Sequence, residues 1–292
     1  MQTDKTKPFK TFNEQLDLMI SRGLEVKDRK YGLKILAKIN YYRLSAYSLT
    51  VRENDRFYTG TKLENIVELY YFDAELRNII MRYTPYVENS FRTYVSYYHS
   101  GKYGPLGYLD SCNFKDKWYH AKFVAKLRGL INRSDDIFIK HHRKDLGDVY
   151  PLWVAIEVTT FDMISKLYKN MLNDDQTLIA KQCSKASREY VANWLQISVF
   201  ARNISAHGGR FYNRDLTYGV TFGKNSRGRI EPKKVFAYIF AIYNLLPSQS
   251  TKDRMIIDLD NNFKKHPFAL KKHLGFPDDW ETILLNNFKN IE

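Results

Sequence analysis

The stretch LENIVELYYFDAELRNIIMRYTPYVENSFRTYVSYYH, residues 63–99, decides the fold of this 292-residue chain. Its apolar residues recur at spacings of three and four with charged residues between them, which is the pattern of an α-helix with one buried face. The residues of that face include Leu69, Phe72, Leu76, Ile79 and Ile80. Proline removes a helical hydrogen bond, so we expect a kink near Pro85. The stretch predicts the longest helix of the chain.

Helical patterns continue on both sides of this stretch. Residues 12–22 and 28–47 predict a helical hairpin that is broken at Gly23. After a turn at residues 101–105, the same spacing predicts helices at residues 118–130, 151–172, 174–184, 187–206, 235–246, 252–264 and 277–288. The segment rich in His, Lys and Asp that runs up to Asp148 predicts a loop.

One segment departs from the helical pattern. Residues 216–222 alternate between apolar and polar side chains, and residues 224–229 have the composition of a turn, which together predict a β-hairpin. The chain has only 14 Gly and 8 Pro, so few tight turns are expected. The sequence therefore predicts an all-α fold with one short β-hairpin. We expect a single domain made of an N-terminal helical hairpin, a core and a C-terminal helical extension, at residues 1–60, 61–215 and 216–292.

The composition limits the partners and the compartment. A net charge of +14 predicts a polyanionic partner, and charge alone leaves RNA, DNA and an anionic membrane open. The first residues lack the apolar core of a signal peptide, and the longest apolar run, Val235 to Leu246, is too short to cross a bilayer. Cys112 and Cys183 suffice neither for a disulfide framework nor for a four-thiolate zinc site. We expect a cytoplasmic protein without a membrane partner.

Arg202-Asn-Ile-Ser-Ala-His207 carries the chemistry. A histidine can transfer a proton between the ribose 2′-hydroxyl and the leaving 5′-oxygen of RNA, while a guanidinium neutralises charge on the phosphoryl oxygens. The amide of Asn203 can hold the histidine or the phosphate. These groups predict RNA cleavage that requires no metal. Gly208 and Gly209 are expected to end the helix, and Arg210 and Arg214 to bind flanking phosphates.

The helical wheel sets a condition on this site. Successive residues turn by about 100°, so Arg202 and His207 lie roughly 140° apart around a regular helix. Two arrangements would still join them in one pocket. Either the helix unwinds at Gly208, or a second copy of the protein completes the pocket across a two-fold axis, which would require a homodimer.

Two further groups of residues have both a functional and a plain structural interpretation. Arg92 and His99 share one helical face and could together bind a phosphate. Alternatively, Glu88 forms an ordinary ion pair with Arg92 four residues away. The basic residues Lys224, Arg227 and Arg229 lie in a stretch that either binds an RNA backbone or forms a solvated loop.

Metal and nucleotide cofactors are not indicated. His141 and His142 are adjacent, and neither an HExxH motif nor paired CxxC motifs exist to complete a zinc site. Gly223-Lys224-Asn225 lacks the upstream glycine and the Ser or Thr of a P-loop. We therefore predict a protein without metal or other cofactor.

The segment from Arg202 to His207 resembles the Arg-x(4–6)-His signature of HEPN ribonucleases. In chain order, four blocks look like the abortive-infection proteins of the AbiD and AbiF type: residues 39–47, 88–103, 151–157 and 202–214. The resemblance extends over residues 11–246. The sequence departs from the pattern at Asp162, where such proteins often have glycine, and at Gly208, where a second histidine is frequent.

This resemblance implies a HEPN-like helical bundle and a metal-independent endoribonuclease that leaves a 2′,3′-cyclic phosphate and a 5′-hydroxyl. It also implies a toxin that defends against phage by growth arrest, restrained by an antitoxin that in this family can be a structured non-coding RNA. The alternative from another functional class is a non-catalytic module that holds a structured non-coding RNA. RNA is the expected partner in both cases.

Overall fold

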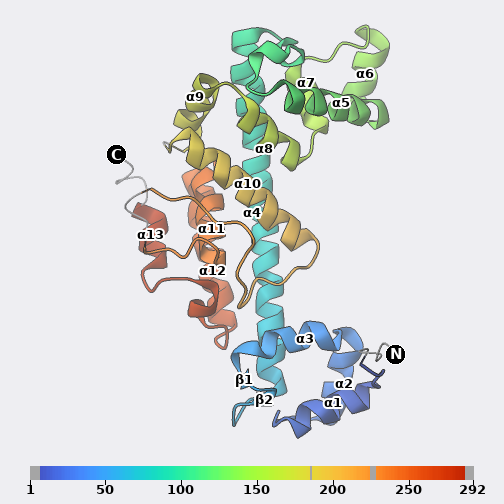
Figure 1. Ribbon diagram of the computed structural model, residues 1–292, viewed down its shortest axis with the longest axis vertical. Coiled ribbons are helices and arrows are strands. Elements are labelled where there is room, and N and C mark those ends of the chain that lie inside the picture. Colours follow the sequence, from blue (N-terminus) through green and yellow to red (C-terminus); the bar gives the residue numbers. More distant parts are fainter. Residues whose placement is uncertain (1–6, 185, 224–227, 287–292) are drawn as a thin grey trace, which may run out of the picture.

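A single long helix runs through the molecule. The computed structural model describes residues 7–184, 186–223 and 228–286. Helix α4 (Leu63–Tyr103) has 41 residues and spans about 60 Å at the usual helical rise. It continues as one helix across Pro85 and ends at Gly104, whose φ is +79°. Figure 1 shows α4 along the long axis, with the N-terminal helices at one end.

The N-terminal unit contains α1 (Phe12–Ser21), α2 (Arg29–Lys38), α3 (Tyr41–Tyr47) and the 3-10 helix η1 (Ser48–Thr50). The prediction of one helix over residues 28–47 was wrong. Ile39 has an extended backbone (φ −121°, ψ 116°), and the side chain of Asn40 accepts a hydrogen bond from the N–H of Tyr42. A new helix is thereby capped two residues after the previous one ends.

The fold contains the expected β-hairpin, but in another place. Strands β1 (Arg52–Glu53) and β2 (Arg56–Phe57) pair antiparallel around Asn54 and Asp55, which both have positive φ. Two successive residues with positive φ are what a tight hairpin turn of type I′ requires.

The predicted location of the hairpin, residues 216–229, was wrong for the described part of that segment. Residues 216–223 form no strand, and residues 224–227 lie outside the described residues. The side chain of Asn193 accepts a hydrogen bond from the N–H of Thr221, while Trp194 donates to the carbonyl of Thr221. The alternating apolar residues pack into the core, while the backbone bonds partly to side chains of α10 (Arg188–Ala206) and partly to the carbonyls of Pro232 and Lys233. The pattern therefore reflects burial without a strand.

The opposite end of α4 carries a helical unit. It comprises η2 (Gly107–Leu109), η3 (Ser111–Asn113), α5 (Lys117–Arg133), α6 (Ile137–Asp145), α7 (Leu152–Ala155), η4 (Ile156–Val158), α8 (Phe161–Asn170) and α9 (Asn173–Cys183). Two predictions were wrong here. The expected loop before Asp148 contains α6, and the expected helix over residues 151–172 is split, because Thr159 is extended and Thr160 caps α8.

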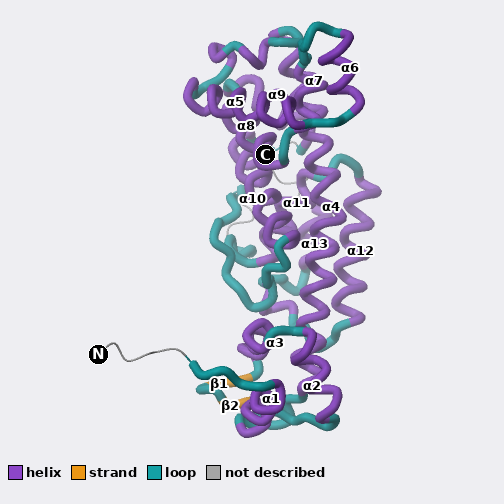
Figure 2. The backbone as a smooth tube through the Cα atoms, turned by 90° about the vertical axis from the view of Figure 1, so that its right-hand side faces the viewer, coloured by secondary structure: helices purple, strands orange, loops and turns teal. Residues whose placement is uncertain are grey.

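Four helices complete the structure beside α4: α10 (Arg188–Ala206), α11 (Val235–Leu245), α12 (Gln249–Lys265) and α13 (Trp280–Asn286), with η6 (Lys271–Leu274) between the last two. Helices α10, α11 and α12 all contact α4, and every residue of α11 is buried. The view in Figure 2 shows α12 running along α4. The all-α prediction with a short hairpin is confirmed.

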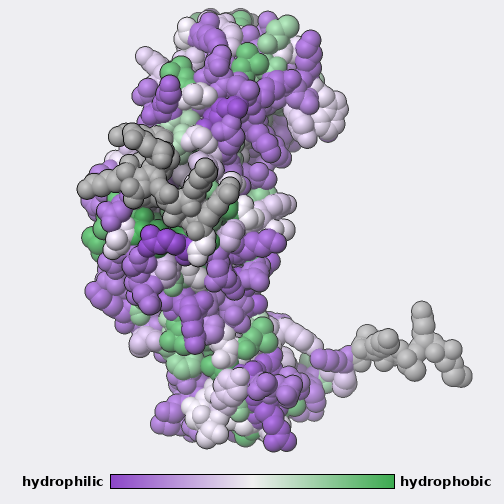
Figure 3. Space-filling model, turned by 60° about the vertical axis from the view of Figure 1, so that its left-hand side comes forward, coloured by the Kyte–Doolittle hydropathy of each residue, from purple (hydrophilic) through white to green (hydrophobic). Residues whose placement is uncertain are grey.

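The face of the molecule seen in Figure 3 is mostly polar. On the face shown in Figure 3, hydrophilic residues predominate and hydrophobic residues form small groups. Within residues 7–184, 186–223 and 228–286, none of the helices combines the length and the apolar character needed to span a bilayer.

A substitution at Phe72 tests how much the buried face of α4 contributes to the stability of the fold. Its ring is fully buried and lies 5.1 Å from that of Phe263 and 6.1 Å from that of Tyr212, so it joins α4 to α12 and to the segment after α10. Phe72→Ala should lower the free energy of unfolding by about 3–5 kcal/mol because of the cavity it leaves. Urea denaturation measures this.

The neighbouring residue Tyr71, which is 47% exposed, provides the control. Tyr71→Ala should change the free energy of unfolding by no more than about 0.5 kcal/mol. Equal losses for the two variants would contradict the central role of the buried α4 face.

Candidate functional site

Helix α10 ends in a turn that places His207 at its tip. The N–H of His207 still donates to the carbonyl of Asn203 at 3.0 Å, as in a regular helix. Gly208 then has φ +64°, its N–H donates to Ser205 O at 3.1 Å, and the N–H of Gly209 donates to Ile204 O at 2.8 Å. This pair of bonds is a Schellman motif. The two glycines end the helix, as the sequence predicts.

Both glycines are required by the geometry. The left-handed backbone of Gly208 disfavours any other residue. A Cβ on Gly209 would lie 2.8 Å from Cγ2 of Ile204, which is too close. The residues after His207 are therefore fixed in one conformation.

The motif residues belong to the last turns of α10 and to its C-cap, His207. Arg202 and His207 are exposed and Asn203 is half-buried. Arg202 Nη1 donates to the side-chain oxygen of its neighbour Asn203 at 3.3 Å. Because His207 keeps its helical hydrogen bond and Gly208 is the first residue with a left-handed backbone, helical geometry extends as far as His207. This favours the arrangement in which a second copy completes the pocket, and both predicted arrangements stay predictions.

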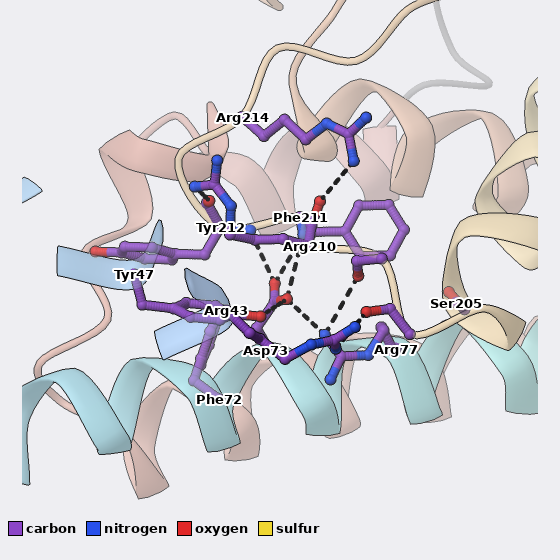
Figure 4. Close-up of polar contacts among 12 residues, drawn as sticks. Arg43, Tyr47, Phe72, Asp73, Arg77, Ser205, Arg210, Phe211, Tyr212 and Arg214 are labelled. Atoms are coloured by element: carbon purple, nitrogen blue, oxygen red, sulfur yellow. Dashed lines mark hydrogen bonds and ion pairs between the residues drawn. The ribbon is translucent and has the colours of Figure 1, made fainter. Parts of the chain in front are cut away.

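A buried carboxylate anchors the chain that leaves this turn. Asp73 of α4 is fully buried, and its oxygens accept hydrogen bonds from the backbone N–H groups of Phe211 at 3.1 Å and Tyr212 at 2.8 Å. The hydroxyl of Tyr47 donates to it at 2.7 Å, and Nη1 of Arg77 at 2.6 Å. Figure 4 shows these bonds converging on Asp73. The carboxylate thus joins α3, α4 and the segment after α10.

Two arginines hold the carbonyl groups of the turn itself. Arg43 Nη1, from α3, donates to the carbonyl of Gly208 at 2.8 Å. Arg77 Nη1 donates to the carbonyl of Gly209 at 3.3 Å as well as to Asp73. These carbonyls lie just beyond the C-cap of α10, so the two guanidinium groups hold the backbone of the turn that follows the helix.

Burial sets the protonation of this network. It raises the pKa of the Asp73 carboxyl, against which the hydrogen bond from Tyr47 and the positive charge of Arg77 act in the opposite direction. Burial and the adjacent Asp73 raise the pKa of Tyr47, so its hydroxyl remains a donor.

The sequence analysis missed Asp73 and Arg77. The signal was present, since both interrupt the buried face of residues 63–99 at a spacing of four. A charged pair among Phe72, Leu76 and Ile79 indicates a partner elsewhere in the chain, but not which one.

The predicted flanking arginines bond to their own loop. Arg210 is half-buried and its Nη1 donates to the carbonyls of Tyr212 at 2.7 Å and Asn213 at 3.0 Å. Burial lowers the pKa of Arg210. Arg214 is exposed and donates to the carbonyl of Arg210 at 3.4 Å. Arg210 thus acts on the loop conformation, whereas Arg214 faces solvent, where a phosphate contact stays a prediction.

Glu88, Arg92 and His99 lie elsewhere on α4. Arg92 pairs with Glu88 at 2.7 Å and donates to the carbonyl of Thr159 at 2.7 Å, so the structural interpretation accounts for this pair. Arg77, at the level of the turn, and Arg92 are separated by about 22 Å along the helix axis. The structure does not bring these residues to the His207 turn.

His99 is in the interior. Its ring is 1% exposed and stacks on Phe114 with 5.2 Å between ring centres. Burial lowers the pKa of His99 to about 4, with Asp175 acting in the opposite direction and His120 and Lys102 adding to the decrease. The ring therefore does not meet the surface where a phosphate would bind.

The remaining predicted RNA contacts are in the C-terminal part. Arg229 pairs with Asp279 at 2.5 Å, which ties its loop to the segment before α13. Lys224 and Arg227 lie outside the described residues. No group of three or more His, Cys, Asp or Glu side chains suited to a metal ion occurs in the described part of the chain.

The Asp73 network can be tested by a double-mutant cycle. Asp73→Ala should lower the free energy of unfolding by about 3–5 kcal/mol, because it leaves the charge of Arg77 buried and unpaired. Asp73→Ala/Arg77→Ala should be less destabilised than the sum of the two single variants, since it removes both charges.

The surface pair of Asp162 and Lys166, also four residues apart, is the matched control. Asp162→Ala should cost less than about 1 kcal/mol. A cycle in which the two Asp73 and Arg77 effects simply add would contradict the coupling.

His99 should make the protein sensitive to acid. Its pKa of about 4 in the folded chain is below the ordinary value of 6.5, so the unfolded chain binds the proton more readily. The contribution of neutral His99 to the free energy of unfolding is fully present above pH 6.5 and is lost as the pH falls towards 4. His99→Phe should therefore flatten the decrease in unfolding free energy over this interval. Unchanged pH dependence in denaturant titrations would show that His99 is not the group responsible.

Comparison with known protein families indicates which family the chain is related to. A family model described as "Abi-like protein" matches residues 34–213, which include α3, α4, α10 and the turn that bears His207. Comparisons with curated proteins and with solved structures gave no match. The matched region is more than half of the chain and agrees with the resemblance drawn from the sequence blocks. The chain belongs to the Abi-like protein family.

Proposed function

We propose that this protein is a metal-independent endoribonuclease with a HEPN-type site centred on His207. Membership of the Abi-like family suggests a role in abortive infection, a defence against phage. The observation that carries the enzymatic proposal is the exposed His207 imidazole at the tip of a fixed helix end, on a chain with a net charge of +14. A group that transfers protons during RNA cleavage needs a fixed position, and a positively charged protein attracts the RNA.

The proposed reaction balances without water or metal. The imidazole of His207 accepts the proton of the ribose 2′-hydroxyl, whose oxygen attacks the adjacent phosphorus atom. The bond from phosphorus to the 5′-oxygen breaks, and that oxygen takes a proton from the His207 imidazolium, which returns to its neutral form. The products are a 2′,3′-cyclic phosphate and a 5′-hydroxyl.

The proposal assigns Arg202 and Asn203 to the second half of a composite pocket. Because Arg202 lies about 140° around the helix axis from His207 of the same chain, Arg202 of a second copy would stabilise the charge that grows on the phosphoryl oxygens. Asn203, bonded to Arg202 at 3.3 Å, would orient the guanidinium. A homodimer is therefore part of the proposal.

We extend the proposal to the biological setting as a toxin. Growth arrest would follow from RNA cleavage in the cytoplasm, and an antitoxin, such as a structured non-coding RNA, would hold the enzyme inactive. The rival proposal is a non-catalytic module that holds such an RNA through the same positive charge.

RNA cleavage with EDTA present separates the two proposals. Wild-type protein should cut RNA at an undiminished rate in EDTA, and His207→Ala should lower that rate by about 10²- to 10⁴-fold because the proton-transfer group is lost. Gel-based kinetics on a labelled RNA would measure both. RNA binding without any cutting would favour the non-catalytic module.

His141 offers a matched control for the histidine substitution. It is also exposed and close to the end of a helix, where it pairs with Asp145. His141→Ala should cut RNA at the wild-type rate. An equal loss for both variants would mean that the effect is not specific to the turn after α10.

Mixing two inactive variants tests the composite pocket. In heterodimers of Arg202→Ala and His207→Ala chains, one intact pocket forms per dimer, so random mixing should restore about a quarter of the wild-type activity. The activity of the mixture is compared with that of each variant alone. No recovery, in a protein shown to be dimeric by light scattering, would contradict the trans role of Arg202.

A further inference from the structure

Arg43 lies against the turn that carries His207, although 165 residues separate it from Gly208. Its Nη1 donates to the Gly208 carbonyl at 2.8 Å. A Cβ built on Gly208 would be 3.4 Å from Nη1 and 3.8 Å from Nη2 of Arg43. The guanidinium group thus packs in van der Waals range of the residue next to His207.

The charge of Arg43 is available to a ligand. The side chain is exposed, and among residues 7–184, 186–223 and 228–286 no carboxylate forms an ion pair with it. Its bond to a neutral carbonyl uses one of five N–H donors and leaves the positive charge uncompensated. Arg77, by contrast, is buried and neutralised by Asp73.

The end of α10 needs such a cation if it is to bind a phosphate. The last carbonyls of a helix repel an anion, and His207 sits at that end. Arg202 of the same chain lies about 140° around the helix axis from His207, so it is poorly placed to compensate. Arg43 brings a full positive charge to the turn directly after the helix end, where it bonds to the Gly208 carbonyl, and a phosphate can therefore bind there beside the imidazole.

We infer that Arg43 is a phosphate-binding residue of the His207 site, acting within the same chain on the phosphodiester that the imidazole cleaves. The inference rests on the proposed ribonuclease function and adds to it a cation from α3, outside the Arg202–His207 motif. It assigns the RNA strand to the surface between α3 and the end of α10.

Cleavage rates test this role. Arg43→Gln should lower kcat by about 10²- to 10³-fold, as loss of one charge-stabilising group does, and Arg43→Lys should recover part of the loss. Arg56→Gln is the control, since Arg56 is an exposed arginine of the same N-terminal unit. A wild-type rate for Arg43→Gln would overturn the inference.

Binding separates phosphate contact from mere support of the turn. A short RNA with every 2′-hydroxyl methylated cannot be cleaved, so its affinity can be measured over a range of salt concentrations. Loss of one phosphate contact should reduce the slope of log affinity against log salt by about 0.7 in Arg43→Gln and not in Arg56→Gln. An unchanged slope, with faster hydrogen exchange at the Gly209 amide, would show that Arg43 only braces the turn.

The binding measurement also distinguishes the two levels of the proposal. If the wild-type protein cuts no RNA, yet Arg43→Gln reduces the salt slope by about 0.7, the ribonuclease is refuted and the phosphate contact is supported. Mixed dimers test the arrangement within one chain: Arg43→Gln with His207→Ala should not recover activity, because neither chain holds both groups. Recovery would place Arg43 and His207 in different chains and overturn the inference.

Discussion

The burial of one carboxylate, Asp73, is the constraint on which the rest of the site depends. An ionised group without water must be fully hydrogen-bonded, and Asp73 meets this requirement with donors from three parts of the chain: Tyr47, Arg77 and the backbone of residues 211 and 212. The end of α10, and with it His207, is thereby fixed relative to α4.

This constraint explains why the N-terminal helices belong to the site. Tyr47 and Arg43 both come from α3, one bonded to Asp73 and the other to the carbonyl of Gly208. Shortening the chain before α4 would remove a donor from a buried carboxylate and a cation from the His207 turn. The N-terminal unit therefore contributes to the architecture of the turn as well as to its charge.

Much of the fold can be predicted from the sequence, because the spacing of apolar residues reports directly on α4, α10 and α11. The break at Ile39 could not be predicted in this way, since it depends on Asn40 capping a new helix rather than on any change in apolar spacing. Residues 216–222 gave a wrong prediction for a related reason: alternating burial is typical of a strand, but here the backbone bonds to α10 side chains at Thr221 and to the carbonyls of Lys233 and Pro232 at Leu216 and Val220. The motif residues at 202–207 were identifiable by type and spacing. The angle between the motif residues around the helix axis was also predictable. The approach of Asp73 and Arg43 to the turn was not, because it depends on tertiary packing between segments that are far apart in the sequence.

Membership of the Abi-like family suggests a role in abortive infection. The chemical proposal is that an imidazole transfers the protons in RNA cleavage without a metal ion. The most direct measurement is mass spectrometry of the ends of RNA fragments formed by the wild-type protein. The account predicts 2′,3′-cyclic phosphate on one fragment and a 5′-hydroxyl on the next. Fragments that end in a 3′-hydroxyl and a 5′-phosphate would contradict it, because water, and not the ribose 2′-oxygen, would then be the attacking group.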